Sequence, residues 1–458
     1  LTFQFLTETF ILTLLATILS ILLTPFLLKM FADFIPDDFH FSLLRQPEVI
    51  LFLIILVFVV TILSGIYPAL ILSGFKPILV LKNQAFANSG SSRSAWFRKS
   101  LTVAQFVIAQ VFIIGTLLVS KQISFALNKD LGFKKDAIVY FRANDNQPAT
   151  KKPVLFNQLN AMPGVAMVSL CSNPPSSSGT WTTIMTVNNG KKDIREEVQI
   201  KLGDTNYIRM YGLHLLAGAT APQSDTTNAV VINETYLHRL GYQDPQKIIG
   251  TQVKEYNGTP HIVGVVADFF PRSLREPIKP LAIANGTKDA NVFSITLQPR
   301  NDNGSNWTAT LASIQKAFHE VYPNDDFDYR FVDESIAKFY TAEKNIARLL
   351  TWATALTIFI SCLGLLGLVI YITTQRTKEI GIRKVIGASV MQLIFLLSRD
   401  FIKLIGLAIL IALPIAWWGS RKWLEHFAYR TPLDWWIFAT GGVILLFIAL
   451  AILCLRTF

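Results

Sequence analysis

Side chains capable of chemistry are present in this sequence, but they are not grouped as catalysis or metal binding requires. The acidic cluster "NDDFD" at 324–328 lacks the ligand spacing of a calcium loop, which favours a solvated turn. The serines of "SNPPSSSGT" at 172–180 have neither a nucleophile-elbow motif nor an evident base. The histidines are scattered, with no pair four residues apart and no neighbouring cysteine: His40, His214, His238, His261, His319 and His426. We therefore predict no catalytic, metal-binding or cofactor-binding residue, and a chain that is not itself an enzyme.

One stretch, "QRTKEIGIRKVIGAS" at 375–389, concentrates charge between two long apolar runs. A basic anchor at the cytoplasmic membrane surface is the simpler interpretation, because Lys and Arg alone would satisfy it. However, apolar side chains are interleaved with the charges, and Gly381 and Gly387 would allow close approach. A short helix with both features can fill a groove on a partner protein. The residues predicted for this contact are Arg376, Lys378, Glu379, Ile380, Gly381, Ile382, Arg383 and Lys384.

The sequence contains no G-x-x-x-x-G-K-[ST] phosphate-binding loop. If ATP drives this protein, a different chain or a missing part must bind it, so no cofactor is expected here. The formal net charge is +11, but the Lys and Arg residues cluster beside apolar runs and no basic, aromatic-rich module is visible. The charge therefore indicates membrane topology rather than nucleic-acid binding.

The elements that must position the charged stretch are membrane spans. Of the 458 residues 51% are hydrophobic and only 16% are charged, against about 25% charged in soluble domains. A bilayer-spanning helix needs roughly 20 mostly apolar residues. The six stretches that meet this length are Phe5–Leu28, Ile50–Leu72, Leu101–Val119, Leu350–Thr373, Phe401–Trp418 and Trp435–Leu455. In the third span, Gln105 and Gln110 are expected to face protein rather than lipid.

Charge in the short loops predicts the orientation of these spans. Residues 74–100 carry five basic residues and no acid, and residues 374–400 are also predominantly basic. Residues 29–48 carry more acidic than basic residues. The two basic loops are therefore expected in the cytoplasm, which places residues 121–345 on the outer face.

The outer segment has the sequence features of a folded α+β domain. "AIVYF", "AVVINETYL" and "HIVGVVADFF" are typical of strands, and "KPVLFNQLNAMPG" and "NWTATLASIQKAFHEVYP" are typical of helices ended by Gly or Pro. The polar, helix-periodic segments next to the third and fourth spans predict a helical stalk between domain and membrane.

Several motifs together resemble the MacB/FtsX-type ABC-transporter permeases, in the two-half arrangement of Bacteroidetes. "QRTKEIGIRKVIGAS" followed by "LLSRDFIKLIGLAILIALPIAWW" is similar to the signature of that family. "SGIYPALILSGFKPILVLK", "VVINETYLHRLGYQDPQKIIGTQV" and "IVGVVADFFPRSLREPIKP" are similar to its span exit and to its periplasmic core domain. The resemblance covers essentially the whole chain and implies the C-terminal portion of a longer polypeptide.

The resemblance implies an inner-membrane, multi-pass permease subunit with a periplasmic domain. A cytoplasmic ABC ATPase dimer would bind the charged helix around Arg376 to Lys384, and ATP-driven closure would move the spans and reshape the outer domain. The outer domain would engage an exported substrate or a periplasmic protein. A non-transporting scaffold that relays ATPase action to a periplasmic or cell-wall partner, and an ATP-independent sensor, remain alternatives.

We therefore expect a membrane protein with six transmembrane helices and one α+β periplasmic core domain on a helical stalk. The expected segments are two spans (1–73), a cytoplasmic basic linker (74–100), a span (101–120), the periplasmic domain with its stalk helices (121–345), a span (346–373), the coupling-helix region (374–400) and two spans (401–458). The sequence does not identify the substrate.

Overall fold

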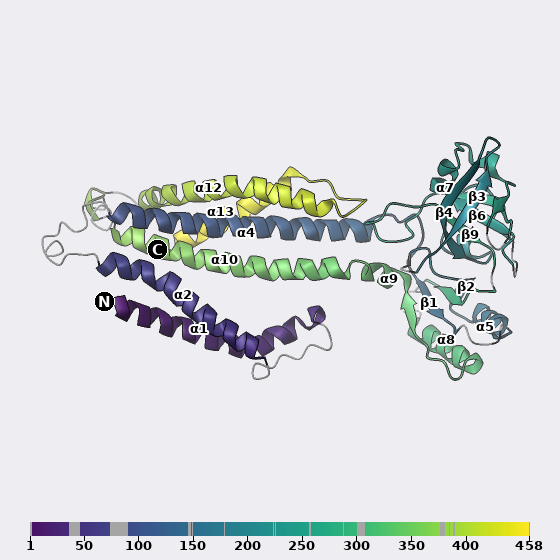
Figure 1. The fold of residues 1–458 in the computed structure, drawn as a ribbon, viewed down its shortest axis with the longest axis horizontal. Coiled ribbons are helices and arrows are strands. Elements are labelled where there is room, and N and C mark those ends of the chain that lie inside the picture. Colours follow the sequence, from purple (N-terminus) through teal and green to yellow (C-terminus); the bar gives the residue numbers. More distant parts are fainter. Residues whose placement is uncertain are drawn as a thin grey trace. The chain divides into compact units, whose positions relative to one another are not determined.

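The computed structural model describes residues 2–457 except 36–45, 74–89, 145–147, 149, 178, 223, 225, 256–257, 287, 300–306, 376–380, 384 and 388–389. The chain divides into two compact units. One comprises Leu1–Ile113, Arg348–Leu413 and Thr440–Phe458, and the other comprises Ile114–Ala347 and Pro414–Ala439. Long helices dominate the first unit, whereas the second contains both β-sheets (Figure 1).

The long helices agree with the predicted spans in position, and several are longer than a span requires. They are α1 (Thr2–Met30), α2 (Pro47–Ser73), α4 (Gly90–Asn128), α10 (Thr341–Gln375), α12 (Val390–Leu424) and α13 (Trp435–Thr457). Within the described residues, five contain a stretch long and apolar enough to cross a membrane. The apolar segment found in α13, Trp435–Ala451, is shorter, so the expected count of six is not confirmed.

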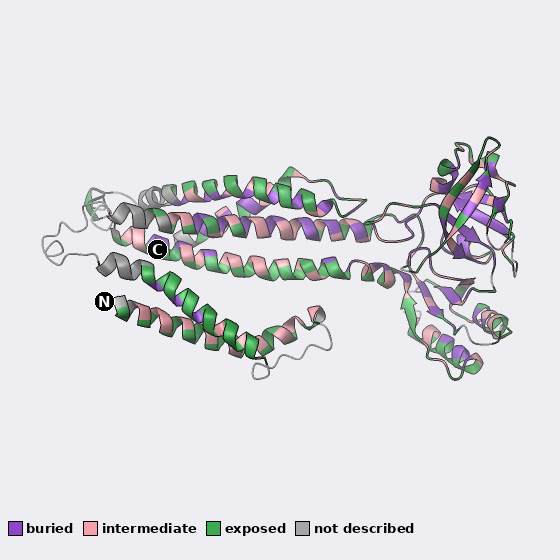
Figure 2. Cartoon of the chain, in the orientation of Figure 1, coloured by how far each residue is buried: buried purple, intermediate pink, exposed green. Residues whose placement is uncertain are grey.

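Helices α1 and α2 pack against each other in the first unit while most of their remaining surface is exposed (Figure 2). Gly65 makes the approach possible, because an added Cβ would lie 2.7 Å from Thr9 Oγ1. The hydroxyl groups of Thr13 and Thr17 donate to the carbonyls four residues earlier, which satisfies these polar groups within the helix. Such an apolar outer surface is stable in lipid and not in water.

Both glutamines of the third predicted span contact neighbouring helices, as the sequence led us to expect. Gln110 is fully buried, and its amide donates to Gly441 O at 3.0 Å and accepts from Gly442 N at 2.9 Å. A Cβ on Gly364 would lie 2.3 Å from Gln105 Oε1, so this glycine lets α10 approach α4. Small residues and amides at helix contacts are typical of membrane helix bundles.

The first sheet of the second unit is antiparallel, in the order β11-β1-β10-β2. Its strands are β11 (Tyr329–Phe331), β1 (Ile138–Arg142), β10 (Val292–Leu297) and β2 (Val165–Cys171). Helices α5 (Lys151–Asn160) and α8 (Trp307–Val321), both predicted as helices from their sequences, pack against each other beside it. In the core between sheet and helices, Phe141 stacks on Phe293 and meets Phe318 edge-to-face.

The second sheet is mixed, in the order β5-β8-β6-β9-β4-β3-β7. Its strands are β5 (Leu215–Gly218), β8 (His261–Val266), β6 (Ala229–Asn233), β9 (Leu281–Ala284), β4 (Asp193–Leu202), β3 (Trp181–Asn188) and β7 (Val253–Lys254). Shorter helices within the described residues are η1 (Ala32–Phe34), α6 (Tyr207–Met210), α7 (Glu234–Arg239), η3 (Pro245–Ile248) and α9 (Val332–Lys338). The α+β character expected for this domain is therefore observed.

Two of the expected strands were predicted too long. "AVVINETYL" is a strand only to Asn233, where the Asn233 side chain accepts a hydrogen bond from Tyr236 N and caps α7. A residue able to cap a helix ends the strand at that point, although β-branched residues precede it. "HIVGVVADFF" is a strand only to Val266, and Asp268 then bonds Thr235 and Asn233 at the α7 N-terminus.

Candidate functional site

The charged helix predicted to contact a partner is described only in part. Gly381, Ile382 and Arg383 are helical and exposed, whereas Arg376, Lys378, Glu379, Ile380 and Lys384 lie outside the described residues. Val385 and Ile386, which follow, are 88% and 79% exposed. Large apolar side chains at such exposure are typical of surfaces that bind another molecule. The partner contact itself remains a prediction.

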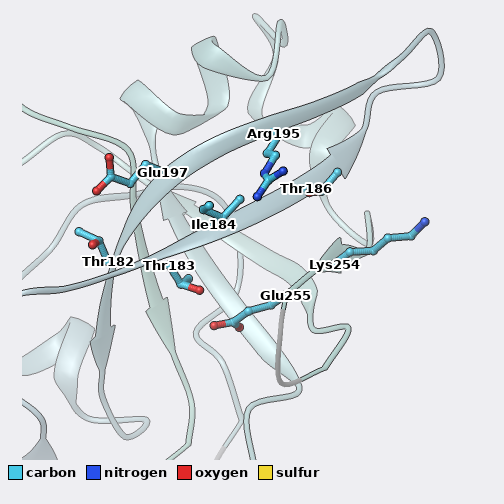
Figure 3. A pocket seen from close by; sticks show the side chains of 8 residues that line it. All are labelled: Thr182, Thr183, Ile184, Thr186, Arg195, Glu197, Lys254 and Glu255. Atoms are coloured by element: carbon cyan, nitrogen blue, oxygen red, sulfur yellow. The ribbon is translucent and has the colours of Figure 1, made fainter.

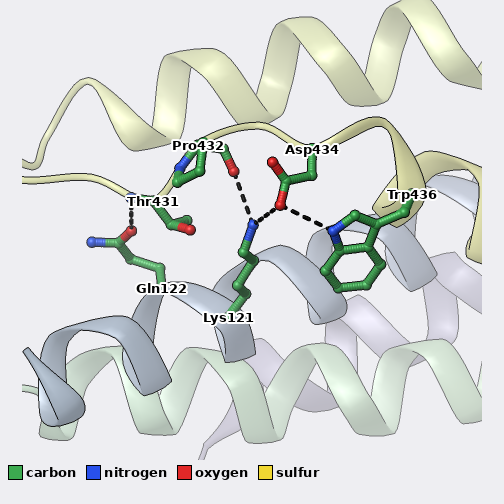
Figure 4. A network of polar contacts seen from close by, with 6 residues as sticks. All are labelled: Lys121, Gln122, Thr431, Pro432, Asp434 and Trp436. Carbon is green, nitrogen blue, oxygen red and sulfur yellow. Dashed lines mark hydrogen bonds and ion pairs between the residues drawn. The ribbon is translucent and has the colours of Figure 1, made fainter.

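A second candidate site, not identified from the sequence, lies in the loop between α12 and α13 (Figure 4). Lys121 of α4 contacts Asp434 Oδ2 at 2.5 Å and donates to Pro432 O at 3.1 Å. Trp436 Nε1 donates to the same Asp434 carboxylate at 3.0 Å. These hydrogen bonds, first that of Lys121, lower the pKa of Asp434 below its ordinary value. We call the loop 425–434 with its partners the α12–α13 clasp.

Gln122, the next residue of α4, also binds the backbone of the α12–α13 loop. Its Oε1 accepts a hydrogen bond from Thr431 N at 2.8 Å, and its Nε2 donates to Tyr429 O at 3.2 Å. Gln122 is 1% exposed, so both ends of a buried amide are satisfied by loop backbone. Such an arrangement fixes the loop on α4 because breaking it would leave buried polar groups unpaired.

The same loop also binds the sheet-bearing part of the unit. Ala428 N donates to Arg275 O at 3.2 Å, and Tyr429 N donates to Leu274 O at 3.0 Å. The Tyr429 ring meets Phe270 edge-to-face, with centroids 4.8 Å apart. The loop therefore joins α4 to the segment 270–275, which follows β8.

Segment 270–275 also contacts residues at the start of α10. Leu274 N donates to the buried Tyr340 hydroxyl at 2.9 Å, and Arg275 forms an ion pair with the buried Glu343. Burial raises the pKa of Tyr340, which keeps its hydroxyl protonated. The contacts of the clasp and of segment 270–275 therefore join residues far apart in the sequence, with Lys121 bonding Asp434 across 313 positions.

A groove of about 780 Å³ lies on the outer part of the seven-stranded sheet (Figure 3). Its lining is polar, with threonines, four charged residues and one isoleucine: Thr182, Thr183, Ile184, Thr186, Arg195, Glu197, Lys254 and Glu255. Partial burial raises the pKa of Glu255, while its hydrogen bond to Thr183 opposes that effect. The threonine run of "WTTIMTVN" was the only sequence signal for this surface.

Lys201 is a buried titratable group on the seven-stranded sheet. It is 1% exposed on β4 and donates to Pro174 O at 2.9 Å and to Ser177 Oγ at 3.2 Å. Burial lowers its pKa to about 7, and nearby Arg272 acts in the same direction. Both acceptors lie in the "SNPPSSSGT" loop, which connects the two sheets. The buried amine of Lys201 therefore binds the loop 172–180, for which no catalytic role was predicted.

Comparison with known proteins shows similarity to MacB/FtsX-type permeases. Residues 352–457 match the model described as FtsX-like permease C-terminal. A macrolide export ATP-binding/permease protein MacB 1 of Yersinia pestis is 26% identical over 327 residues, covering 68% of this chain and 46% of the relative. A probable export ATP-binding/permease protein of Pseudomonas fluorescens is 22% identical over 234 residues, covering 49% and 36% respectively.

A solved structure, the periplasmic region of MacB from Actinobacillus actinomycetemcomitans, aligns with 47% of this chain and 98% of its own at 13% identity and a TM-score of 0.33. The chain spans less than half the length of the curated relatives it matches. The family model and the MacB relatives confirm the resemblance to MacB/FtsX-type ABC permeases that the sequence motifs indicated.

Proposed function

We propose that this MacB/FtsX-type chain is the permease part of an ABC-type exporter. A separate cytoplasmic ATPase would bind the charged helix around Arg383, and its ATP-driven closure would change the shape of the outer domain. The ATPase activity would reside in the partner, consistent with the absence of a phosphate-binding loop from this sequence. The bilayer would be the inner membrane, with the sheet-bearing domain in the periplasm.

The single observation that carries this proposal is the α12–α13 clasp. Its loop connects two membrane-length helices and is bonded both to α4 and to segment 270–275. Neither the hydrogen bonds to α4 nor those to segment 270–275 are needed to close a short loop between two helices. A loop bonded to both elements can transmit a displacement of α12 and α13 to the domain, because hydrogen-bonded elements move together.

The exposed part of the charged helix supports the ATPase-contact step. Ile382, Val385 and Ile386 are all exposed and lie within one turn and a half of Arg383. When such a helix binds in a partner's groove, the apolar side chains are buried and the neighbouring cation orients the helix, as in other amphipathic helices. A lipid-surface anchor would use the same residues, so the experiment must separate protein binding from membrane binding.

The test uses the full-length protein, purified from detergent-solubilised membranes with and without charge reversal at Arg383 and Lys384. Co-purification of a P-loop ATPase only with the unaltered protein is the expected result. A matched control is charge reversal at Arg421, an exposed basic residue at the other end of α12. If no ATPase co-purifies with any form, the exporter proposal fails. If an ATPase binds but no substrate is exported, the chain is instead a scaffold relaying ATPase action to an outer partner.

A further inference from the structure

A short buried segment, "PPSS" at 174–177, lies in the connection between the two β-sheets. It follows β2 of the four-stranded sheet and precedes β3 of the seven-stranded sheet. Pro174, Pro175 and Ser176 are buried. Because proline has no backbone N–H, the segment can form few backbone hydrogen bonds. Side chains from other elements must therefore hold it in place.

A single buried amine supplies two of the hydrogen bonds to segment 174–177. Lys201 Nζ donates to Pro174 O at 2.9 Å and to Ser177 Oγ at 3.2 Å. The backbone adds a bond from Ser177 N to Pro271 O at 3.1 Å. Ser176 Oγ is buried and has no hydrogen-bond partner among the described residues. The buried position of the segment thus leaves one hydroxyl unpaired, which costs free energy and makes the bonds from Lys201 important.

The Lys201 side chain is buried without a counter-ion. It is 1% exposed, and the titratable groups that face it are Cys171 on β2 and Arg272 in segment 270–275. No ion pair between Lys201 and a carboxylate occurs in the described part of the chain. Burial of an ammonium group without a carboxylate is unfavourable, so the buried position favours the neutral amine. The Arg272 cation acts in the same direction.

The groups around Lys201 differ in the pH at which they change charge. Burial lowers the pKa of Lys201 to about 7. Burial raises the pKa of Cys171 to about 12 and that of Tyr207, whose hydroxyl donates to Asn173 O, well above its ordinary value. Arg272 stays protonated throughout this range. Of these groups, Lys201 is the one that changes charge between pH 6 and pH 9.

We infer that segment 174–177 is a proton-controlled latch between the two sheets. The latch is closed on a neutral Lys201 amine. When the amine takes up a proton from solvent, the open latch becomes more populated, because water then hydrates both the ammonium group and the Ser176 hydroxyl. Opening releases Pro174 and Ser177 from β4, which loosens the connection between β2 and β3. The pH of the medium thereby controls how firmly the two sheets are joined.

The direction and size of the effect follow from proton linkage. In the open latch the hydrated Lys201 has its ordinary pKa of 10.5, against about 7 in the closed latch. Between these values the open state holds the proton and the closed state does not, so the opening constant falls by up to about tenfold per pH unit. It falls roughly fiftyfold from pH 7 to pH 9 and changes by less than about twofold from pH 6 to pH 7.

The test measures hydrogen exchange of the Ser177 amide between pH 6 and pH 9, with the full chain in nanodiscs. Division by the intrinsic exchange rate at each pH gives the opening constant, provided that reclosing is faster than exchange. The Ala229 amide, on the buried strand β6 and bonded to Asn285 Oδ1, reports opening of the seven-stranded sheet itself. We expect a larger opening constant at Ser177 than at Ala229, with the roughly fiftyfold fall between pH 7 and pH 9.

Two variants separate the charge from the hydrogen bond. Lys201→Met removes the titrating group and keeps a long unbranched side chain, so the opening constant at Ser177 should vary by less than about twofold from pH 6 to pH 9. Ser177→Ala removes one acceptor and keeps the amine. It should raise the opening constant by about two- to tenfold at every pH and retain the pH dependence.

A pH-independent opening constant at Ser177 in the wild type, or an unchanged pH dependence in Lys201→Met, would overturn the inference. Equal opening constants at Ser177 and Ala229 at every pH would show that the whole sheet opens instead of the latch, and would overturn it as well. The assay needs neither an ATPase nor a substrate, so its failure is independent of the proposed exporter function.

Discussion

Lys121 and Asp434 form an ion pair across 313 positions of sequence, with Nζ and Oδ2 2.5 Å apart. The pair joins α4 to the residue immediately before α13. It is partly exposed, so its contribution to stability is small, since water screens such pairs. Its importance lies in geometry, because it fixes where the loop meets α4. The neighbouring Gln122 completes the same junction with a buried amide.

Breaking this ion pair should weaken the coupling between the permease and its partner ATPase more than it lowers the stability of the permease. We expect Lys121→Met or Asp434→Asn to lower permease-dependent stimulation of the partner ATPase by roughly two- to thirtyfold, the range typical of coupling residues. The melting temperature should stay within about 2 °C of wild type. Stimulated ATPase rates in nanodiscs provide the measurement, with Lys422→Met as the control. Unchanged stimulation in both clasp variants would show that the clasp is only structural.

Replacing Gln122 tests the buried half of the clasp. Gln122→Leu leaves Thr431 N without its acceptor and Tyr429 O without its donor. We expect a loss of about 1–3 kcal/mol in the free energy of unfolding. Hydrogen exchange should accelerate at Thr431 and at Ala428 and Tyr429, which bond segment 270–275. Ser120→Ala, an exposed change on the same helix, serves as the control, and a loss of equal size there would contradict the prediction.

Lys201 predicts a pH dependence of stability. Its pKa is lowered to about 7 in the folded protein, against an ordinary 10.5 in the unfolded chain. Between these values the unfolded chain holds the proton and the folded one does not, so stability rises with pH above about 7. The slope reaches at most about 1.4 kcal/mol per pH unit. Below pH 7 both states are protonated, and the full cost of the buried charge is present and constant.

The variant Lys201→Met should flatten this profile and raise the melting temperature most at pH 6. Melting temperatures of wild type and variant between pH 6 and 9 measure the effect. Lys254→Met, at an exposed position on β7, is the matched control and should keep the wild-type slope. An identical slope in Lys201→Met would show that a different group titrates.

The charged helix gives the remaining prediction. Among the described residues, no atom lies within 4 Å of a Cβ added at Gly381, so Gly381→Trp adds a large side chain to the predicted docking surface. We expect this variant to lose ATPase binding while its expression and membrane insertion stay at wild-type level. Gly381→Ala should retain binding, because it adds only a methyl group. Wild-type ATPase binding by the tryptophan variant would count against the contact role of Arg376 to Lys384.

Much of the architecture is determined by local sequence. Runs of some 20 apolar residues specify membrane helices wherever they occur, and basic loops orient them. Two helices of the outer domain, α5 and α8, were predicted from periodicity and their terminal Gly or Pro. Gln105 and Gln110 were assigned to helix contacts because an amide facing lipid is costly. The strand prediction failed at "AVVINETYL", where the cap formed by Asn233 overrode β-propensity.

The clasp and the buried amine were decided only by tertiary structure. Lys121 and Asp434 are ordinary charged residues until the fold brings them together across most of the chain. Nothing in "QIKLGD" distinguishes Lys201, whose pKa depends on the loop that covers it. The sequence determined local hydrophobicity and charge, whereas burial and pairing depend on contacts between distant segments, which only the folded chain creates.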